Sequence, residues 1–451
     1  MMKKNAQMSL DETLNRQEVF WKEKARIRWH MDGDRNSKYV HRVTKIKNKT
    51  KMISSIRNEE EIITNPQRIA NHFVDYFSNL FGTNTILQDH SLADEVIPKL
   101  IDEQTNNLLT SIPNKEEIKR AVFDLNSESA HGPYDFGAFF FKLTGTLFNM
   151  MSLQQLFNFL QTGWLLQNYN ANSIILIPKS SNANTVDQFR PIALANFKFK
   201  IITKVIVDRL ASILPKIIST EQKGFIRGRN IKDYILLASE AINMLDKKSY
   251  GSNLALKIDV TKVFDTLNWN FLLHVLKCFG FNQIFCKWIS TILHSSTMSI
   301  SINGTQNGYF KCPRGVRQGD SLSLILFCLA EEVLSRGIPK LVDEGNLSLM
   351  KATRHIQFPS HCFYADDLMV YCKGRMSNLQ ALKELFTRYA SCSGQIINLR
   401  KSSIFHGGIS PNRLHDIVDL LGFSIGSLPF SYLGAPIFKG KPKTIFFSTI
   451  C

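Results

Sequence analysis

The acidic residues that end two apolar segments are the strongest candidates for chemistry in this sequence. The run from Leu254 to Val260 has the composition of a buried strand and carries Asp259 near its end. Asp366 and Asp367 lie between two further apolar runs, at the expected turn of a hairpin. If these strands are neighbours, three carboxylates meet at one point, where cations must offset their mutual repulsion. Mg²⁺ fits such oxygen ligands and completes its shell with water and substrate phosphates.

Paired divalent ions at such a group of carboxylates would have a specific use. Two ions a few ångströms apart stabilise both the attacking and the leaving oxygen of an in-line phosphoryl displacement. An isolated Asp-Asp pair is more often an ordinary polar turn, however. The pair alone therefore leaves both interpretations open.

The charge of the chain indicates which partners to consider. Lysine and arginine number 55 against 38 acidic residues, giving a formal net charge of +17. Between Arg16 and Arg57 there are 13 basic residues and four acidic ones, interleaved with Trp21, Trp29 and Tyr39. Cations for phosphates and flat rings for bases favour single-stranded nucleic acid as a partner. A basic helix with its aromatic residues in the core, and a solvated basic surface, are the alternatives.

The remaining composition predicts a soluble intracellular protein without deciding between nucleus and cytoplasm. All eight cysteines lie at or after Cys278 and none forms a C-x-x-C pair, so we expect free thiols, no disulfide partner and no zinc site. No apolar run is long enough to span a membrane, and the N-terminus lacks the apolar core of a signal peptide. The length of 451 residues corresponds to about three domains.

The elements that must position the acids follow from apolar spacing and from capping residues. Helices are predicted at 66–82, 115–125, 143–160, 198–214, 234–245, 271–279 and 323–334. A strand is predicted at 173–177 and another at 254–260, with hairpins formed by 298–302 with 308–312 and by 362–364 with 368–371. Helices and strands are mixed along the chain without strict βαβ alternation, which predicts an α+β fold.

The order of the motifs resembles that of one known family. The segments in question are Gly33-Asp34-Arg35-Asn36-Ser37-Lys38, Ile174 to Lys179, Phe189-Arg190-Pro191-Ile192, Gly224 to Arg229, the Asp259 segment, Arg314 to Asp320, Tyr364-Ala365-Asp366-Asp367, Gly394 to Lys401 and Phe430 to Gly434. Together they resemble the reverse transcriptases of LINE-type, non-LTR retrotransposons, especially those of plants. A colinear series of this kind is far more specific than any single motif.

The resemblance implies a right-hand polymerase fold with palm and fingers and a role for each matching residue at the reaction centre. Asp259 and Asp366 would ligate two Mg²⁺ ions, with Mn²⁺ as an alternative, and Asp367 would assist. Phe264 would exclude the 2′-hydroxyl of a ribonucleotide, since an apolar ring offers that group no hydrogen bond. Lys401 would act as the general acid for the pyrophosphate leaving group.

The resemblance also implies contacts to the substrates, which would be dNTPs, an RNA template and a DNA primer. Lys179 and Arg190 would hold the triphosphate, and Gln318 and Gly319 would contact the template and the nascent base pair. The primer grip would be Tyr432, Leu433 and Gly434, and the basic contacts to nucleic acid would be Arg26, Arg28, Arg35, Lys38, Arg227 and Arg229. Taken singly, each residue has an ordinary alternative: Phe264 as core, the lysines as solvated cations, Arg190 as a turn cap.

The same resemblance suggests how the chain divides. We expect a basic N-terminal extension at 1–90, a reverse transcriptase domain at 91–440 with its core at about 170–440, and a truncated tail at 441–451. Few residues follow Gly434, so the thumb is expected to be largely missing, and the chain is interpreted as a fragment or decayed copy without its endonuclease. RNA-directed DNA synthesis is the predicted activity. An inactive nucleic-acid-binding remnant is the main alternative, and an intron maturase-like splicing cofactor is a weaker one.

Overall fold

The structure, a computed structural model, describes residues 52–82, 90–126, 132–133, 145–352 and 357–440, without side-chain detail for 145–153. Most of the predicted N-terminal extension, with Arg26, Arg28, Arg35 and Lys38, and the predicted tail 441–451 lie outside the described residues.

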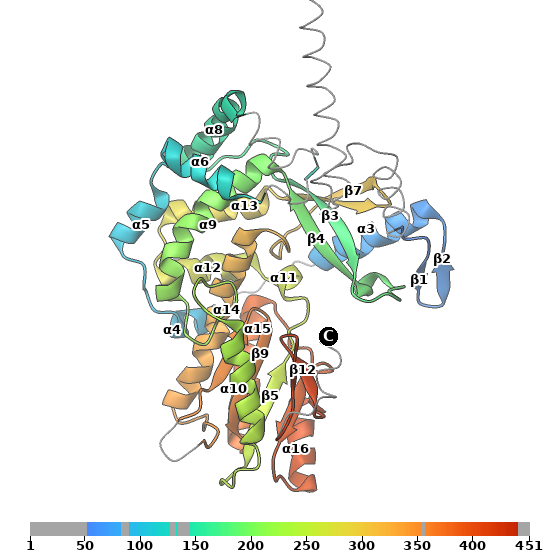
Figure 1. The fold of residues 1–451 in the computed structure, drawn as a ribbon, viewed down its shortest axis with the longest axis vertical. Coiled ribbons are helices and arrows are strands. Elements are labelled where there is room, and N and C mark those ends of the chain that lie inside the picture. The colour runs from blue at the N-terminus through green and yellow to red at the C-terminus, as the bar shows by residue number, and fades with distance from the viewer. Residues whose placement is uncertain (1–51, 83–89, 127–131, 134–144, 353–356, 441–451) are drawn as a thin grey trace, which may run out of the picture.

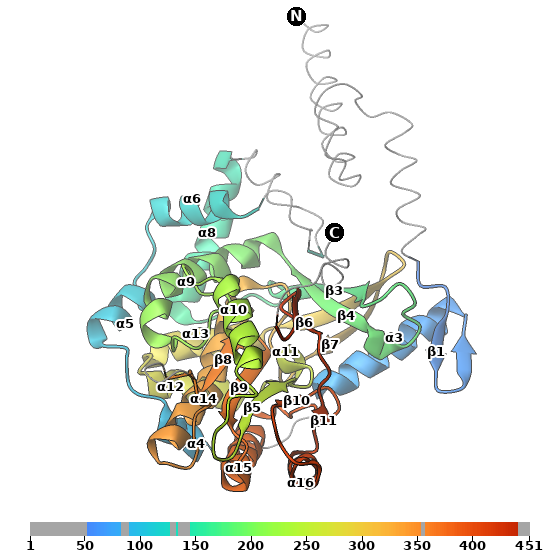
Figure 2. The ribbon, with the colours of Figure 1, turned by 60° about the horizontal axis from the view of Figure 1, so that its bottom comes forward.

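The helices are α3 (Pro66–Gly82), α4 (Ser91–Val96), α5 (Glu103–Thr110), α6 (Lys115–Asp124), α8 (Gly145–Thr162), α9 (Phe197–Ile217), α10 (Ile231–Asn243), α11 (Val263–Thr266), α12 (Trp269–Phe279), α13 (Gln283–His294), α14 (Ser321–Asp343), α15 (Met376–Ser393) and α16 (Pro411–Leu421), with a short 3₁₀ helix at Val186–Gln188. The strands are β1 (Ile56–Asn58), β2 (Glu61–Ile63), β3 (Ala171–Pro178), β4 (Phe189–Ala195), β5 (Asn253–Ile258), β6 (Thr297–Ile302), β7 (Thr305–Lys311), β8 (His361–Tyr364), β9 (Asp367–Lys373), β10 (Ser403–His406), β11 (Ser424–Ile425), β12 (Phe430–Tyr432) and β13 (Ala435–Ile437). Figure 1 shows their arrangement, and Figure 2 shows it from a second direction.

A five-stranded sheet in the order β11-β10-β5-β9-β8 carries the predicted acids. Strand β5 runs antiparallel to both β10 and β9, and Ile258 at its end lies opposite Leu368 near the start of β9. Strands β8 and β9 form a hairpin in which Tyr364 pairs with Asp367. The end of β5 and the turn of this hairpin are therefore neighbours, as the sequence predicted.

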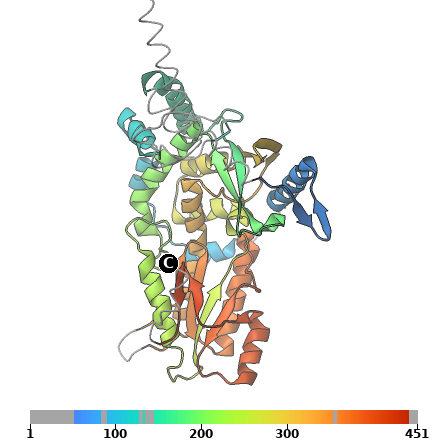
Figure 3. The same ribbon diagram turned by 45° about the vertical axis from the view of Figure 1, so that its right-hand side comes forward.

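This sheet is buried on both faces, which explains why its central strands are almost entirely apolar. Leu254, Leu256 and Ile258 of β5 belong to the main hydrophobic core, together with residues of α12, α14 and α15. Ala255 and the alternate residues of β9 face a second core formed with α10, β12 and β13. In Figure 3, α10 lies on one side of the strands, and α15 and α16 lie on the other.

A separate four-stranded sheet in the order β4-β3-β6-β7 adjoins the first through loops and helices. Strand β3 pairs antiparallel with β4 and parallel with β6, and β6 and β7 form the predicted hairpin. Helix α3 packs on this sheet through Phe73, Phe77 and Phe81, on the right-hand side of Figure 1. The described part of the predicted extension is thus packed against the rest of the chain, while the proposed domain boundaries stay a prediction.

The predicted elements correspond to observed ones, most of them with boundaries shifted by one to three residues, and two differences in extent bear on the site. The strand predicted to reach Val260 ends at Ile258, since Val260 makes only an isolated bridge to Ile397. The helix predicted at 323–334 is part of the longer α14, which begins at Ser321 where the Asp320 carboxylate accepts a hydrogen bond from the Leu322 amide. The coarse prediction of mixed helices and strands is confirmed, whereas the assignment of palm, fingers and thumb stays a prediction.

Two further expectations concern membrane-spanning helices and thiols. Within the described residues, no helix combines the length and apolar character needed to cross a membrane. The seven cysteines in the same part of the chain are all free. These findings agree with the predicted absence of a membrane span and of disulfide bonds in the described ranges.

Candidate active site

The three predicted aspartates come together beyond the ends of β5 and β9. Asp259 directly follows β5, Asp366 lies in the hairpin turn, and Asp367 is the first residue of β9. Partial desolvation raises the pKa of Asp366, which stays accessible to solvent at the turn, and the charge of Asp259 raises it further. Desolvation also raises the pKa of Asp367, together with the charges of Asp366 and Asp259. The charges of the three carboxylates therefore act unfavourably on one another, the electrostatic condition predicted for a cation site.

The turn that presents Asp366 has an unusual backbone. Ala365 adopts a left-handed φ of 56°, a conformation that costs about 1 kcal/mol or more for a residue with a side chain. The buried Gln222 holds it there: its Oε1 accepts from the amides of Ala365 (3.1 Å) and Gly224 (2.8 Å). A Cβ at Gly224 would lie 2.4 Å from the Ala365 nitrogen, so only glycine permits this close approach. Gly224, the first residue of the predicted motif from Gly224 to Arg229, thus supports the hairpin that carries Asp366.

A loop after α15 fixes the backbone of Asp259. The Asn398 amide donates to the Asp259 carbonyl at 2.7 Å, and the Asp259 amide donates to the buried Ser402 Oγ at 3.1 Å. The Ser402 hydroxyl in turn donates to the Asn398 carbonyl at 2.8 Å. These bonds hold the acid in place after the strand has ended.

The basic residues predicted to contact the triphosphate surround the same place. Lys179 and Arg190 are exposed: Lys179 directly follows β3, and Arg190 lies near the start of the neighbouring β4. The Asp187 carbonyl accepts a hydrogen bond from Lys179 Nζ at 2.6 Å. Partial desolvation lowers the pKa of Lys179, and the nearby charges of Lys401 and Arg190 lower it further. The charge of Arg190 also acts on Asp366, whose pKa it lowers. The structure thus brings these cations within electrostatic range of one another and, through Arg190, of the acids.

Phe264 lies in the short helix α11, a few residues beyond Asp259 in the chain. Its half-buried ring packs against the ring of Phe327, with the centroids 4.6 Å apart and the planes tilted by 41°. The next residue, Asp265, is buried, and desolvation raises its pKa to about 6 against the opposing charges of Lys262 and Lys179. Sequence reasoning missed Asp265, which no strand or turn signal distinguishes from a surface acid.

The loop with Gln318 and Gly319 is fastened to strand β4. The Ala193 amide donates to the Gln318 carbonyl at 2.8 Å. Gly319 has a φ of 108°, and a Cβ there would lie 2.9 Å from the Ala193 carbonyl oxygen. The left-handed φ and the lack of room for a Cβ explain why position 319 is a glycine. Without a side chain, the backbone at Gly319 can pass close to Ala193 of β4.

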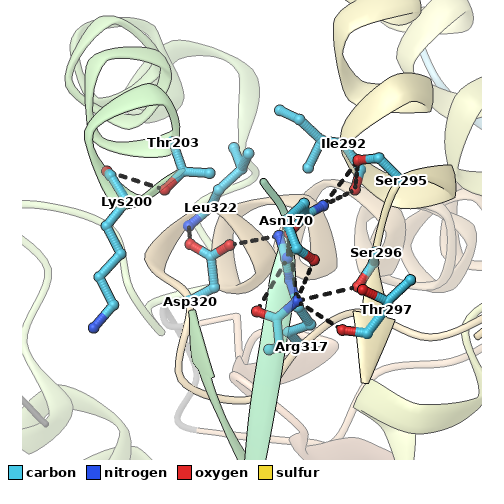
Figure 4. A network of polar contacts seen from close by, with 11 residues as sticks. Asn170, Lys200, Thr203, Ile292, Ser295, Ser296, Thr297, Arg317, Asp320 and Leu322 are labelled. Carbon is cyan, nitrogen blue, oxygen red and sulfur yellow. Dashed lines mark hydrogen bonds and ion pairs between the residues drawn. The ribbon is translucent and has the colours of Figure 1, made fainter. Parts of the chain in front are cut away.

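Arg317, which sequence reasoning did not select, organises this loop from the interior (Figure 4). Its guanidinium donates to the side-chain oxygens of Asn170, Asn172 (3.4 Å) and Asp320 (3.0 Å), and lies 4.7 Å from the centroid of the Phe199 ring. The same Asp320 caps α14. A buried cation paired in this way ties β3, α9 and α14 to the Gln318 loop.

The predicted primer grip forms the tight β12–β13 hairpin. Leu433 and Gly434 occupy its turn with φ of 50° and 79°. The Tyr432 ring is buried in the second core, where its hydroxyl contacts Cys362 Sγ at 3.5 Å. Lys257 Nζ donates to the Ser431 carbonyl at 3.2 Å, which joins the hairpin to β5. The β12–β13 hairpin forms its own two-stranded sheet and packs on the five-stranded sheet that carries the aspartates. The buried Tyr432 ring holds it there and is not an exposed contact.

Two predicted nucleic-acid contacts differ in surroundings. Arg227 is exposed. Arg229 donates from its guanidinium to the carbonyls of Ile218 (2.9 Å), Ser219 and Gln222. Arg229 therefore closes the end of α9 and fixes the segment before Gly224, a structural role that leaves little of its donor capacity for a nucleic acid.

Comparison with known proteins decides the family. The model of the reverse transcriptase (RNA-dependent DNA polymerase) family matches residues 177–437, which include every strand of the five-stranded sheet and all three aspartates. The chain belongs to the reverse transcriptase family. The family predicted from the order of the motifs is thereby confirmed.

Three relatives, two of them named as proteins of transposable elements, agree with this assignment. The chain is 26% identical over 388 residues to the transposon TX1 uncharacterized 149 kDa protein of Xenopus laevis, covering 84% of this chain and 29% of that protein. It is 26% identical over 257 residues to the Pol polyprotein of the type-2 retrotransposable element R2DM of Drosophila melanogaster, covering 56% of this chain and 23% of that protein. A putative COX1/OXI3 intron 1 protein of Saccharomyces cerevisiae is 28% identical over 401 residues, covering 81% of this chain and 44% of that protein. The chain spans less than half the length of each of these relatives.

Proposed function

We propose that this chain catalyses RNA-templated DNA synthesis, in which a primer 3′-hydroxyl attacks the α-phosphate of a dNTP and pyrophosphate leaves. The family match supports the reaction class. The observation that carries the proposal is that the end of β5 brings Asp259 next to the β8–β9 hairpin of Asp366 and Asp367, where their charges repel one another. Such a group of like charges is unfavourable in a resting protein and becomes favourable when divalent cations bind.

The donor set at this turn fits two Mg²⁺ ions. All the candidate ligands are carboxylate oxygens, and Asp366 remains accessible to solvent and to substrate. Asp259 and Asp366 would hold both ions, with Asp367 assisting. When bound, the ions would supply charge stabilisation for the attacking and leaving oxygens. Mn²⁺ shares the preference for oxygen ligands and would serve as a substitute.

The surrounding side chains would bind and select the nucleotide. Lys179 would attract the triphosphate as a point charge and Arg190 as a bidentate fork. Lys401, whose charge acts on Lys179, would give a proton to the leaving pyrophosphate. Phe264, which packs against Phe327, would exclude the 2′-hydroxyl of a ribonucleotide.

The partners would be an RNA template and a DNA primer. The backbone of Gln318 and Gly319 would contact the template and the new base pair. The close packing of this loop against Ala193 of β4 holds that backbone in place. The β12–β13 hairpin at Tyr432 to Gly434 would position the primer end. Arg227, with Arg26, Arg28, Arg35 and Lys38, would add sequence-independent contacts to phosphates.

Extension of an oligo(dT) primer on poly(rA) tests the proposal. We expect Mg²⁺-dependent incorporation of dTTP that Asp366→Asn abolishes. Asp416→Asn, a change of an exposed aspartate on α16, serves as the matched control and should leave incorporation unchanged. Circular dichroism of both variants verifies that they fold.

The main alternative is an inactive remnant that still binds nucleic acid. Binding of the primer–template without incorporation, at any Mg²⁺ or Mn²⁺ concentration, would support that alternative and contradict the proposed activity.

A further inference from the structure

A second group of potential metal ligands lies away from the aspartates, where α4 packs on α12. Helix α12 contributes His274 and Cys278, which are four residues apart and therefore lie on one face of the helix. Asp94 of α4 lies against this face, and His90 is the N-cap residue of the same helix. Two pairs with the same spacing, from helices far apart in sequence, thus converge.

The donor atoms of this group are close enough to share one ion. Asp94 Oδ1 lies 2.8 Å from His274 Nε2 and 3.4 Å from Cys278 Sγ. The three donor atoms all lie within 4.8 Å of one another. The His90 ring stacks on the His274 ring at 4.9 Å between centroids, with planes 23° apart. Asp94 is largely exposed and His274 is partly exposed, which leaves a path for an ion to enter.

The chemistry of these donors differs from that of the aspartate group. Nitrogen, sulfur and oxygen donors in a tetrahedral arrangement suit Zn²⁺, whereas Mg²⁺ requires oxygen ligands. We propose that Asp94, His274 and Cys278 form a structural Zn²⁺ site, with the fourth position taken by His90 or by water. The cysteine spacing could not predict this site, because a single cysteine combines here with ligands of two other types.

The place of α4 in the fold indicates what such an ion would do. Glu95, next to Asp94, pairs with Lys340 of α14 at 3.1 Å and with Arg388 of α15. Helix α4 is therefore the element that joins α12, α14 and α15 on the surface of the main core. Exposed ion pairs contribute little to such a junction, because solvent and salt screen them. A metal bridge from α4 to α12 would hold it more firmly.

Cobalt binding to the untagged full chain tests this proposal, because a Co²⁺–thiolate bond gives a charge-transfer absorption band that oxygen ligands do not give. We expect one Co²⁺ per chain with this band, and its loss when Zn²⁺ displaces Co²⁺. Cys278→Ser should remove the band. His274→Ala should weaken Zn²⁺ binding by at least about a hundred-fold, since even loss of an outer-shell partner costs about 10–100-fold.

Matched variants separate this site from other metal sites. Cys286→Ser, a change of a free buried thiol on α13, should keep the band, and so should Asp366→Asn. Zn²⁺ should also raise the thermal midpoint of the wild-type chain but not of Cys278→Ser. Wild-type protein without the band, or Cys278→Ser that keeps it, overturns the proposal and leaves the three residues as a hydrogen-bonded contact between α4 and α12.

Discussion

Two groups of acids lie close together in this molecule and have opposite environments. Asp259 follows β5 beside the hairpin of Asp366 and Asp367, and none of the ion pairs within the described residues involves their carboxylates. Glu331 and Glu332 lie inside α14, almost completely buried. The charge of Asp366 acts on Glu331, so the two groups are also electrostatic neighbours.

Most of the carboxylate oxygens of the buried pair have partners, and within the described residues only Glu331 Oε2 of this pair has none. Glu332 accepts from the Ser219 amide (3.0 Å), the Ser219 hydroxyl (2.8 Å) and Arg336 Nε (2.9 Å). Burial raises the pKa of Glu331 to about 8, so this residue is mainly neutral at pH 7. Glu331 Oε1 accepts from the Tyr389 hydroxyl at 2.9 Å, and the same hydroxyl lies 2.7 Å from Gln395 Oε1.

The difference separates structural acids from acids available for chemistry. An acid that stabilises the fold has its charge paired or its proton retained. The three aspartates form no ion pair within the described residues, and only the more distant charges of Arg190 and Lys257 act on Asp366 and Asp367. Their arrangement becomes favourable when cations bind. Unpaired like charges, rather than burial or a raised pKa, thus distinguish the candidate active site.

The largest predicted effect comes from exchanging one acid in each group. Asp259→Asn should lower primer extension by about 10³-fold or more, because several kcal/mol of charge stabilisation are lost, while the free energy of unfolding stays the same or rises. Glu332→Gln should do the reverse, destabilising the fold by about 1–3 kcal/mol through weakened buried hydrogen bonds. Single-turnover extension and urea denaturation measure the two effects. If Asp259→Asn and Glu332→Gln changed the extension rate and the free energy of unfolding equally, the distinction between chemical and structural acids would be wrong.

A smaller effect concerns the side chain next to the aspartates. Phe264→Ala should lower the preference for dNTPs over ribonucleotides by about 10²-fold, by removing the bulk that excludes the 2′-hydroxyl. Phe264→Leu keeps most of that bulk and serves as the control. Competing incorporation of dTTP and UTP on poly(rA) measures the preference, and a dNTP-only Phe264→Ala enzyme would show that another residue excludes ribonucleotides.

The pH dependence of the free energy of unfolding tests the buried acid Glu331. Glu331 retains its proton in the folded chain up to about pH 8, whereas in the unfolded chain it releases the proton near pH 4.5. The free energy of unfolding should therefore fall as pH rises from about 4.5 to about 8 and then level off. Glu331→Gln should flatten this slope, because the glutamine Oε1 can still accept from the Tyr389 hydroxyl but the amide does not titrate.

Metal-free denaturation curves across this pH range check the prediction. The exposed Glu240→Gln on α10 is the control and should retain the slope. A slope that survives in Glu331→Gln means that another group is responsible.

The smallest effect tests site geometry without changing any charge. Gly319→Ala should cost about 2–3 kcal/mol, combining left-handed strain with a clash against the Ala193 carbonyl. Gly228 has a φ of 83°, and a Cβ there would meet no other atom within 4 Å, so Gly228→Ala should cost only the strain, about 1 kcal/mol. Thermal denaturation compares them, and equal losses would mean that the approach to β4 is not tight.

The sequence predicted the centre of the site because its signals are local. The apolar runs on either side of Ala365 and Asp366 identify a hairpin, and the run before Asp259 identifies a strand. The sequence alone does not determine that the strand and the hairpin are neighbours in one sheet, and the structure shows that β5 pairs with β9 of the hairpin. The order of the motifs also identified the family correctly.

The supporting residues could not be predicted, because their roles depend on contacts distant in sequence. Gln222 bonds to Ala365, 143 residues away, and nothing in its own surroundings marks it. Ser402 and Asn398 fix Asp259 from a loop that gave no strand or helix signal. Glu332 resembles a solvent-facing residue of a helix until Ser219, 113 residues away, is placed against it.

Binding of Mn²⁺ to the nucleotide-free chain, followed by electron paramagnetic resonance, tests the central claim most directly. If Asp259, Asp366 and Asp367 together form the cation site, the wild-type chain and Asp416→Asn bind Mn²⁺ saturably, and Asp366→Asn loses that binding while remaining folded. Identical binding curves for wild type and Asp366→Asn would contradict the account.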